Sequence, residues 1–409
     1  MTVRNMKKFS LVTFFIVIFA IFLTEYCLAD EVPIVLFDGL LIDGTGSDPI
    51  PEAVVIIEKD KIISIGTTKT VTIPDKAKMI RLEGKTIMPG LINAHVHRGY
   101  DRQNLKTWAK AGVTTVRDLA FSDMDVQWFE RRDVLLQDPT NARLVAVGPM
   151  VTTPGGYPIA PFRLEAMTVK NSAEATKKTK ELLQRGADLI KIAIEDGKYY
   201  LLPEPLPVLP SENAAAVVAT AHRYGKKVTA HVTNPELLPG LIKTGVDDLA
   251  HMVLGDLSHD MIMSIIKNDI YWVPTLELWH HVQQHPRARQ AKFMPHTTAV
   301  ANLRNFVEAG GKVALGTDYD GFNALFELGM PMVEIDSMKE AGMTPMQIIV
   351  AATKHAAHVC NLAEKLGTLE VNKIADIIVI NRNPLNDLSY LKDISLVIHN
   401  GIIIRNNLN

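Results

Sequence analysis

The sequence contains little cysteine and almost no net charge. Only two of its 409 residues are Cys, and 43 basic residues are balanced by 45 acidic ones, which gives a formal net charge of −2. Two cysteines cannot supply the dense disulfide frame of a small secreted domain, and a chain of this length buries roughly 75% of its unfolded surface without one. The absence of a basic excess removes the electrostatic term on which nucleic-acid binding depends. We therefore expect a large globular protein of one or two domains with no nucleic-acid partner.

Long apolar runs are also missing, apart from one at the N-terminus. Three basic residues within the first eight positions precede an apolar run over 9–23, and the small-residue end Cys27-Leu28-Ala29 follows. This order is typical of a secretory signal peptide. The run has 15 residues, fewer than the roughly 20 that a spanning helix needs, so an uncleaved anchor is the weaker alternative. We predict a signal peptide over 1–29 with cleavage after Ala29, a periplasmic or secreted location, and no membrane association after cleavage.

Cleavage would change the charge and the cysteine count. The removed segment carries three basic residues and one acidic residue, so the mature chain would have 40 basic and 44 acidic residues. Cys360 would be the one cysteine left, which excludes an intramolecular disulfide. It lies in the helix-like run 351–360, where we expect a buried, unreactive side chain.

The two ends of the mature chain have the pattern of β-strands, and the middle does not. Short β-branched runs separated by turn signals fill 34–88 and recur over 374–404. Between them, eight short apolar runs alternate with helix-like stretches, of which 174–185 and 212–224 are the clearest. The runs lie near 91–94, 113–116, 144–147, 188–194, 228–230, 247–250, 271–276 and 313–316.

Eight buried strands alternating with helices are typical of a (β/α)8 barrel. A doubly wound open sheet is the alternative, although no dinucleotide-binding fingerprint follows an early strand. We therefore predict an α/β protein, a (β/α)8 TIM barrel with a small composite β-sandwich domain formed by both chain ends. The predicted boundaries are 30–88 and 363–409 for the two parts of the sandwich and 89–362 for the barrel.

Polar side chains end or interrupt five of the eight apolar runs, and the strand ends are where barrel enzymes carry their chemistry. His95 and His97 end the first run and point to the same side of a strand, so they can share one metal ion. Two surface histidines are the alternative interpretation. Lys191 interrupts the fourth run, where an unpaired buried ammonium would be unfavourable. Carboxylation by CO2 to a carbamate, or an ion pair with a neighbouring carboxylate, would resolve this.

Three further runs carry one ligand-type residue each. His231 ends the fifth run, His251 the sixth and Asp318 the eighth. Taken singly, each histidine fits a core or surface position, and the aspartate fits a helix cap. Together with the residues of the first and fourth runs, they would converge at one rim of a barrel. Imidazole and carboxylate ligands suit Zn2+ and related divalent ions.

The segments that carry these residues form a set of motifs. They are 89–97 (PGLINAHVH), 112–118 (GVTTVRD), 186–191 (GADLIK), 230–232 (AHV), 249–251 (LAH), 315–318 (LGTD), 367–371 (GTLEV) and 373–376 (KIAD). With these motifs the sequence resembles the amidohydrolase superfamily. More narrowly, it resembles the imidazolonepropionase-like group that includes metal-dependent Xaa-Pro dipeptidases. The resemblance runs over nearly the whole mature chain, and the motifs together are highly specific.

The resemblance implies a binuclear metal centre. His95, His97 and Asp318 would hold the more buried ion, and His231 and His251 the other. Lys191, as its CO2-derived carbamate, would bridge the two ions together with a hydroxide. The expected cofactors are two divalent ions, with Zn2+ the first candidate, although Mn2+ and Co2+ share these ligands. The ions would lower the pKa of the bridging water, and Asp318 would act as the catalytic residue that moves a proton to the leaving amine.

Substrate recognition is expected in the loops that follow the strands. The candidates are Arg98 beside the histidine pair, Tyr157 and His280. Arg98 would clamp a substrate carboxylate, or else serve as a solvated or structural charge. Tyr157 stands where related proteins often have the histidine of a Gly-Gly-His stretch, so this sequence departs from the family pattern there.

The other histidines are assigned ordinary roles. Two on a predicted late helix are expected to be structural, namely His355 and His358. Those in polar or loop surroundings are expected to be solvated, namely His222, His259, His285, His296 and His399.

The predicted function is that of an exported, metal-dependent amidohydrolase acting on a small-molecule substrate. It would cleave the amide C–N bond of a cyclic amide, an N-acyl amino acid or an Xaa-Pro-type dipeptide. An esterase, lactonase or phosphotriesterase with the same binuclear site is the first alternative, because a bridging hydroxide does not distinguish these centres. A non-catalytic binding protein on the same fold is the second, although no ligand position is lost. The sequence leaves the oligomeric state open, a homo-oligomer included.

Overall fold

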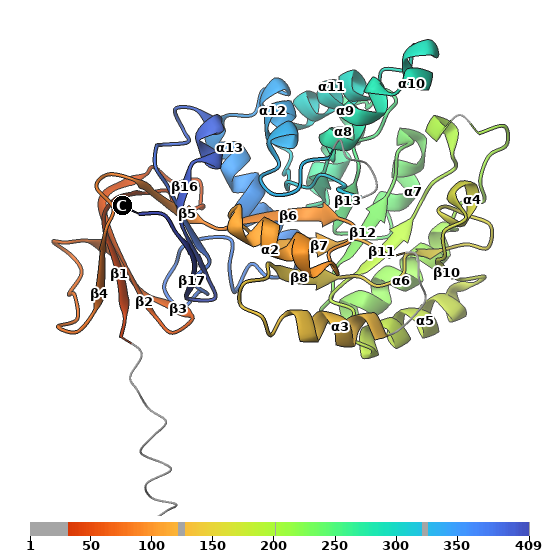
Figure 1. The fold of residues 1–409 in the computed structure, drawn as a ribbon. Helices are drawn as coiled ribbons and strands as arrows, with labels where there is room; N and C mark the ends of the chain where they lie inside the picture. The colour runs from red at the N-terminus through yellow and green to blue at the C-terminus, as the bar shows by residue number, and fades with distance from the viewer. Residues whose placement is uncertain (1–31, 122–126, 201, 321–325, 409) are drawn as a thin grey trace, which may run out of the picture.

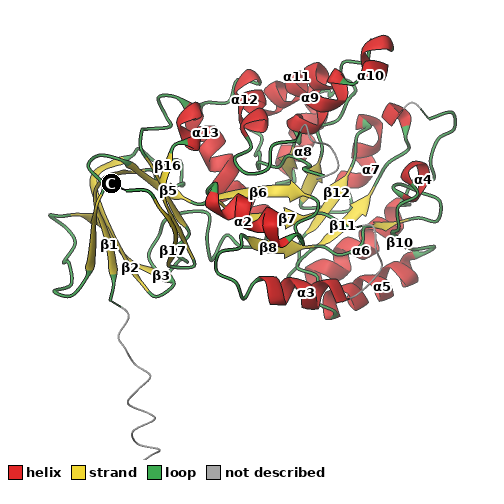
Figure 2. Cartoon of the chain, in the orientation of Figure 1, coloured by secondary structure: helices red, strands yellow, loops and turns green. Residues whose placement is uncertain are grey.

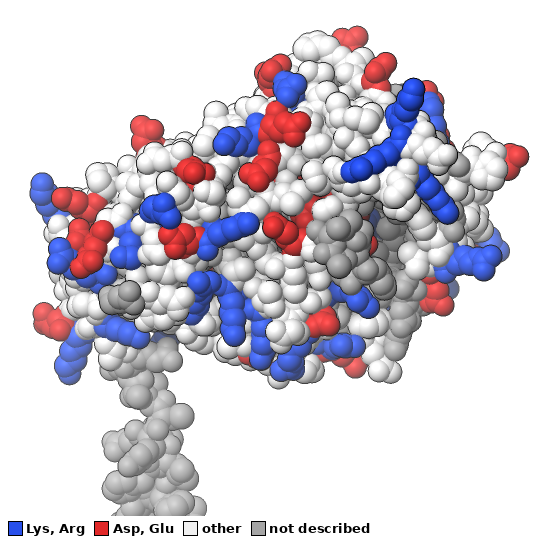
Figure 3. All heavy atoms as spheres, turned by 45° about the horizontal axis from the view of Figure 1, so that its top comes forward, with Lys and Arg blue, Asp and Glu red and all other residues white. Residues whose placement is uncertain are grey.

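The computed structural model describes residues 32–121, 127–200, 202–320 and 326–408. The predicted signal peptide, 1–29, lies outside these ranges, so its cleavage and the export of the chain remain predictions. No helix within the described ranges is both long and apolar enough to span a bilayer. Acidic and basic side chains are interspersed over the face seen in Figure 3.

Strands from both chain ends form one eight-stranded sheet, at the left of Figure 1. The order is β17-β16-β15-β5-β1-β2-β3, and β4 pairs with β1. The antiparallel pairing of β5 with β15, in which Met88 lies opposite Ile378, joins the N-terminal strands to the C-terminal ones. A β-sandwich consists of two packed sheets, whereas these strands are hydrogen-bonded into one. The predicted sandwich domain and its boundaries therefore remain a prediction. The strands are β1 (Ile34–Leu41), β2 (Ile50–Glu58), β3 (Lys61–Thr67), β4 (Lys78–Arg81), β5 (Thr86–Pro89), β15 (Ile377–Ile380), β16 (Ile394–His399) and β17 (Ile402–Asn406).

Parallel strands form the middle of the chain, in two sheets of order β6-β7-β8 and β10-β9-β11-β12-β13-β14. Every residue of β6, β7, β11, β12, β13 and β14 is buried, as expected for strands that helices cover. Seven of the eight predicted runs are strands, and β9 and β10 are additional short ones. The strands are β6 (Leu91–Val96), β7 (Val113–Asp118), β8 (Arg143–Ala146), β9 (Val151–Thr152), β10 (Met167–Thr168), β11 (Ile190–Ala193), β12 (Val228–His231), β13 (Asp248–Ala250) and β14 (Tyr271–Val273).

The eighth run, 313–316, is not a regular strand, and this corrects the sequence-based expectation. The segment makes single bridges to β14 and β6, through Val313 and Tyr319. Asp318 interrupts the extended conformation with a left-handed φ of 63°, and a side chain on Gly316 would collide with β6. The strands therefore have a TIM-barrel-like order, although those in the described ranges do not trace a closed barrel.

Helices cover the outside of the parallel strands (Figure 2). The two helices predicted most clearly are confirmed as α5 (Ser172–Gln184) and α6 (Ser211–Arg223). Short helical turns lie at η1 (Lys198–Tyr200), η2 (Pro235–Leu237), η3 (Ala351–His355) and η4 (Leu388–Lys392). The remaining helices are α2 (Arg102–Lys110), α3 (Gln127–Leu135), α4 (Ile159–Phe162), α7 (Leu238–Ile242), α8 (His259–Lys267), α9 (Leu276–Gln284), α10 (Pro286–Gln290), α11 (Pro295–Glu308), α12 (Met332–Glu340), α13 (Pro345–Val350) and α14 (Ala356–Val359).

Three predictions about single side chains have clear outcomes. Cys360 is buried, as predicted, and burial raises the pKa of its thiol to about 12, which makes it unreactive. His296 and His399 are also buried, so the prediction that they are solvated is wrong. Each has a polar partner that compensates for burial: the hydroxyl of Ser337 lies 3.1 Å from His296, and the carboxylate of Asp376 lies 3.1 Å from His399.

An ion pair between Arg117 of β7 and Asp248 of β13 lies in the interior, and both side chains are fully buried. The guanidinium donates to both carboxylate oxygens, at 2.9 and 3.0 Å. Arg117 also donates to the carbonyl of Ala94 on β6, and Thr229 of β12 donates to Asp248. The pair therefore ties four parallel strands together.

We expect Asp248→Ala to destabilise the protein by roughly 3–5 kcal/mol, because it leaves the Arg117 charge buried without a partner. Chemical denaturation followed by circular dichroism measures this loss. The control is Glu236→Ala, which removes one partner of an exposed ion pair with Lys198 and should leave the denaturation midpoint unchanged. A loss below about 1 kcal/mol for Asp248→Ala would show that the interior pair does not hold the strands.

Candidate metal centre

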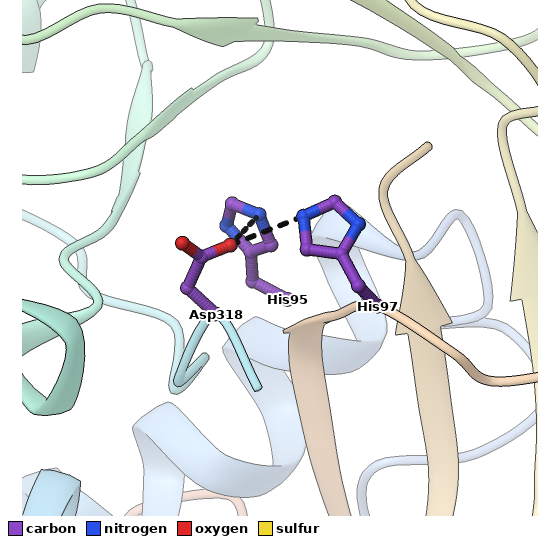
Figure 4. Close-up of side chains that lie close together, drawn as sticks. All are labelled: His95, His97 and Asp318. Atoms are coloured by element: carbon purple, nitrogen blue, oxygen red, sulfur yellow. Dashed lines mark ion pairs between the residues drawn. The ribbon is translucent and has the colours of Figure 1, made fainter. Parts of the chain in front are cut away.

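Two histidines and an aspartate meet at the carboxyl end of β6. His95 is the fifth residue of this strand, and His97 follows its last residue, so both rings point to the same side. Asp318 approaches from the segment between β14 and β6, and its Oδ1 lies 2.9 Å from Nε2 of His95 and 3.2 Å from Nε2 of His97 (Figure 4). Within the described ranges, these three are the one group of His, Cys, Asp or Glu side chains close enough together to hold a metal ion.

The other three predicted ligands surround this group. The Nζ of Lys191, on β11, lies 3.3 Å from Nε2 of His95. His231 ends β12, and His251 follows the last residue of β13. The ring centroids of His231 and His251 are 4.5 Å apart, and that of His251 is 4.8 Å from that of His95. All six predicted side chains are thus brought together, and their metal-binding role remains a prediction.

Hydrogen bonds on the outer side of the histidines decide which ring nitrogen faces the centre. Nδ1 of His97 lies 2.7 Å from the carbonyl oxygen of Ala120, which can only accept, so Nδ1 carries a proton and Nε2 faces the centre. This Nε2 lies 3.2 Å from the Asp318 carboxylate, which outweighs the effect of burial and raises the pKa of His97. An unprotonated Nε2 and a carboxylate that face each other repel unless a cation or a proton lies between them.

His231 and His251 have partners of the same kind. Nε2 of His231 lies 3.4 Å from the carboxylate of Glu195, which leaves the lone pair on Nδ1. Nδ1 of His231 is buried and has no hydrogen-bond partner among the described residues. Nδ1 of His251 lies 2.9 Å from the hydroxyl of Thr275, which can donate or accept and holds the ring by this nitrogen. Metal-binding histidines are oriented in this way, by a second partner on the nitrogen that does not bind the metal.

Burial sets the protonation states at the centre. Desolvation lowers the pKa of Lys191 to about 8, so its neutral amine is accessible near neutral pH. Desolvation, assisted by the charge of Lys191, also holds the pKa of His95 well below its ordinary value. Desolvation lowers the pKa of His231 and, more strongly, of His251. These three imidazoles are therefore neutral at pH 7, which is the form that binds metal ions.

The backbone around the centre is strained. Five non-glycine residues there have positive φ angles, and Thr275 is the least favourable because its side chain is β-branched. The φ of Thr275 is 48°. Two residues after Thr275, the backbone N–H of Glu277 donates to the carboxylate of Glu334 at 2.7 Å. Such strain persists where the surrounding structure fixes it, and it concentrates at functional sites. The five residues are Arg98, Ala120, His251, Thr275 and Asp318.

A cavity of about 720 Å3 opens above the centre and contacts two of the three predicted substrate residues, Arg98 and Tyr157. The ring of Tyr157 stacks on that of His231, with centroids 4.0 Å apart. The structure does not bring His280 to this cavity, because helix α9 carries it toward His296, with a ring separation of 5.2 Å.

Several residues of the site were not identified from the sequence. Glu195 and Thr275 hold His231 and His251, and Tyr200 has its hydroxyl 3.4 Å from Nε2 of His231. Asp118 lines the cavity, and burial raises the pKa of its carboxyl group to about 6. Asp118 could have been found, because it ends one of the quoted motifs. The other three carry no comparable signal, because a polar residue after a strand is usually only part of a turn.

Comparison with known proteins agrees with this geometry. The model of the amidohydrolase family matches residues 86–404. Ochratoxinase of Aspergillus niger is 25% identical over 425 aligned positions, which cover 89% of this chain and 84% of that protein. A crystal structure of a Xaa-Pro dipeptidase with bound methionine in its active site is similar with a TM-score of 0.78 and 26% identity, covering 91% of this chain and 99% of the other. Molinate hydrolase has a similar fold, with a TM-score of 0.76, 22% identity, and coverage of 92% and 95%.

We predict that Thr275→Val lowers the affinity of the centre for Zn2+ roughly 10–100-fold, because it removes the hydroxyl that orients His251 while keeping the shape of the side chain. Competition with a chromophoric chelator measures the affinity. Thr179→Val is the matched control, because Thr179 is buried in α5 and its hydroxyl has no partner among the described residues. An affinity of Thr275→Val within twofold of the wild type would exclude the orienting role.

Proposed function

The chain belongs to the amidohydrolase family, whose model spans 86–404, and on this premise we propose that it cleaves an amide bond with two divalent cations held at the candidate centre. It is a hydrolase that acts on carbon–nitrogen bonds, as the family match and the similar hydrolases indicate. The substrate is a small molecule such as a cyclic amide, an N-acyl amino acid or an Xaa-Pro-type dipeptide. The metal-dependent step is supported chiefly by one observation, the meeting of four imidazoles, the Asp318 carboxylate and the Lys191 amine at one buried place.

The residues present fit two cations. His95, His97 and Asp318 would hold one, since Oδ1 of Asp318 lies 2.9 Å from Nε2 of His95 and 3.2 Å from Nε2 of His97. His231, through Nδ1, and His251, through Nε2, would hold the other. Neutral imidazole and carboxylate oxygen without a thiolate favour Zn2+, and the same set accepts Mn2+ or Co2+.

Lys191 fits a carbamate better than an ion pair. Only 1% of its surface is exposed, and no carboxylate within the described ranges lies within ion-pair distance of its Nζ. Its Nζ lies 3.3 Å from Nε2 of His95, and an imidazole cannot neutralise an ammonium. The lowered pKa favours the neutral amine, which is the form that adds CO2. As a carbamate, Lys191 would turn a buried positive charge into an anionic ligand able to bridge two cations.

Cations at this centre would lower the pKa of a bound water and polarise the substrate carbonyl. The side chains of the protein do the remaining work. Asp318 is an acceptor within 3.2 Å of two imidazoles, and its carboxylate can take a proton from the attacking water and return it to the leaving amine. The buried ring of Tyr157 packs against His231 and keeps bulk water away from that side of the site.

Three further proposals concern the whole chain. The N-terminal pattern of basic, apolar and small residues supports export to the periplasm or the exterior. The bridges made by Val313 and Tyr319 support closure of the parallel strands into a barrel by the segment between them. The pairing of β5 with β15 supports one composite domain built from 30–88 and 363–409.

We predict that Asp318→Asn retains less than about a tenth of the wild-type kcat, because the amide cannot accept and return the proton. Steady-state kinetics on the metal-loaded variant measures the loss, with metal content and circular dichroism recorded in parallel to separate chemistry from binding and folding. Asp260→Asn, an exposed aspartate at the start of α8, is the control and should keep full activity. A higher retained kcat would remove Asp318 from the proton transfer.

Removal of the metal tests the proposed function as a whole. Treatment with a chelator should abolish turnover, and Zn2+ with bicarbonate should restore it together with about two metal equivalents per chain. The loaded enzyme is then tested on N-acyl amino acids, Xaa-Pro dipeptides, lactones and aryl phosphotriesters. Hydrolysis of esters or phosphotriesters alone would overturn the amide assignment. Less than half an equivalent of metal, with no gain of activity on reloading, would favour a binding protein without catalysis.

A further inference from the structure

The cavity above the candidate centre is rich in aromatic side chains. Of the nineteen described residues that line it, five are Phe, Tyr or Trp, whereas these types make up 6% of the whole chain. Its volume of about 720 Å3 lies within the roughly 300–1,000 Å3 typical of small-molecule sites. The aromatic residues are Tyr100, Phe121, Trp128, Tyr157 and Phe162.

Three of these residues form a continuous aromatic wall, which we define as Tyr100, Phe121 and Trp128. Tyr100 follows β6, Phe121 follows β7, and Trp128 lies in α3. The ring centroids of Phe121 and Trp128 are 5.0 Å apart, and the ring of Tyr100 packs edge-on against both, at 5.3 and 4.9 Å. Because each ring is fixed by the other two, the wall offers a preformed apolar surface beside the metal centre.

The second aromatic group lies where the cavity meets solvent. Phe162 packs edge-on against Tyr157 at 5.8 Å, and Tyr157 in turn stacks on His231 of the centre. Phe162 is 49% exposed and its neighbour Leu164 is 43% exposed, although both line the cavity. Exposed apolar side chains beside a cavity are typical of a surface that a ligand covers.

Several charged groups of the cavity, outside the candidate centre, are engaged with the protein. Arg131 donates to the carbonyl oxygen of Tyr100 at 3.3 Å and lies over the Trp128 ring, 5.2 Å from its centroid. Charged residues of both signs at the cavity also have partners, namely Arg98, Glu165 and Asp320. The aromatic surface is therefore the main feature of the cavity that can recognise a substrate.

On the basis of the proposed function, we propose that the cavity binds a flat aromatic group attached to the scissile amide. The wall stacks on one side of the group, and Phe162 and Leu164 cover it at the solvent side. Aromatic pairs add stacking and edge-to-face contacts to the gain from burial, so the group contributes to transition-state binding whenever it anchors the amide at the centre. N-Aroyl amino acids, or N-acyl derivatives of aromatic amino acids, would then be better substrates than their aliphatic counterparts.

Two matched substrate pairs test the proposal on the metal-loaded enzyme. N-(2-Naphthoyl)-L-alanine against N-acetyl-L-alanine varies the acyl side, and N-acetyl-L-tryptophan against N-acetyl-L-alanine varies the amine side. We expect kcat/KM to be at least about tenfold higher for the aromatic member of one pair, since a single methylene in an apolar pocket already changes kcat/KM by about 10-fold or more. Values within about twofold in both pairs would overturn the proposal.

Variants locate the effect. Phe162→Ala and Trp128→Ala should each reduce the preference for the aromatic member at least threefold. Phe162 is half exposed, so its replacement leaves the core intact even if Trp128→Ala does not fold. Tyr224→Ala is the matched control, because Tyr224 is an exposed aromatic residue at the end of α6, outside the cavity, and should leave the preference unchanged. An unchanged preference in Phe162→Ala would contradict the proposal that Phe162 covers the aromatic group at the solvent side of the cavity.

Calorimetry separates failure of this inference from failure of the proposed function. The probes are 2-naphthoate and acetate, which share a carboxylate and differ in the aromatic ring. Hydrolysis of no amide at all would contradict the proposed function, yet at least tenfold tighter binding of 2-naphthoate would still support the aromatic site. Equal binding of the two probes would overturn the aromatic site whatever the enzyme hydrolyses.

Discussion

Lys191 places a nearly buried amine within strand β11, beside the cavity and against an imidazole. Its Nζ lies 3.3 Å from Nε2 of His95, and no carboxylate in the described ranges pairs with it. An ammonium in this position is costly, and the neutral histidines around it cannot compensate for it. Loss of the proton removes the cost, and the proposed conversion to a carbamate would add an anionic ligand beside the histidines. The proposal of a metal centre thus rests on the burial of this one side chain as much as on the histidines.

The parallel strands hold the side chains of the candidate centre in this arrangement. Parallel strands present their carboxyl ends at one edge, so residues far apart in the chain meet there. Below them, the buried pair of Arg117 and Asp248 ties the strands together. Above them, the strained Thr275 orients His251, while Glu334 accepts from the backbone at the start of α9. Rigid support below and backbone strain above hold the imidazole rings in position, as the proposed metal centre would require.

The sequence predicted the ligand-type residues because each one interrupts or ends an apolar run, and buried polar groups are rare enough to be noticed. The strands that carry them were predicted for the same reason. The prediction of a strand over the eighth run was wrong. The left-handed conformation of Asp318, just after the run, and the close approach at Gly316 are backbone properties that an apolar pattern does not reveal. Contacts between loops were also hidden. The partners Glu195 and Thr275, the aromatic wall, and the turn of His280 away from the cavity all depend on how segments pack, which no local pattern encodes.

Anomalous diffraction from crystals of the Zn2+-loaded protein grown with bicarbonate tests the central claim most directly. Two zinc positions per chain are predicted, one contacting His95, His97 and Asp318 and the other contacting His231 and His251, with electron density for a carbamate on Nζ of Lys191 between them. Absence of zinc among these side chains, or an unmodified Lys191 paired with a carboxylate, would contradict it.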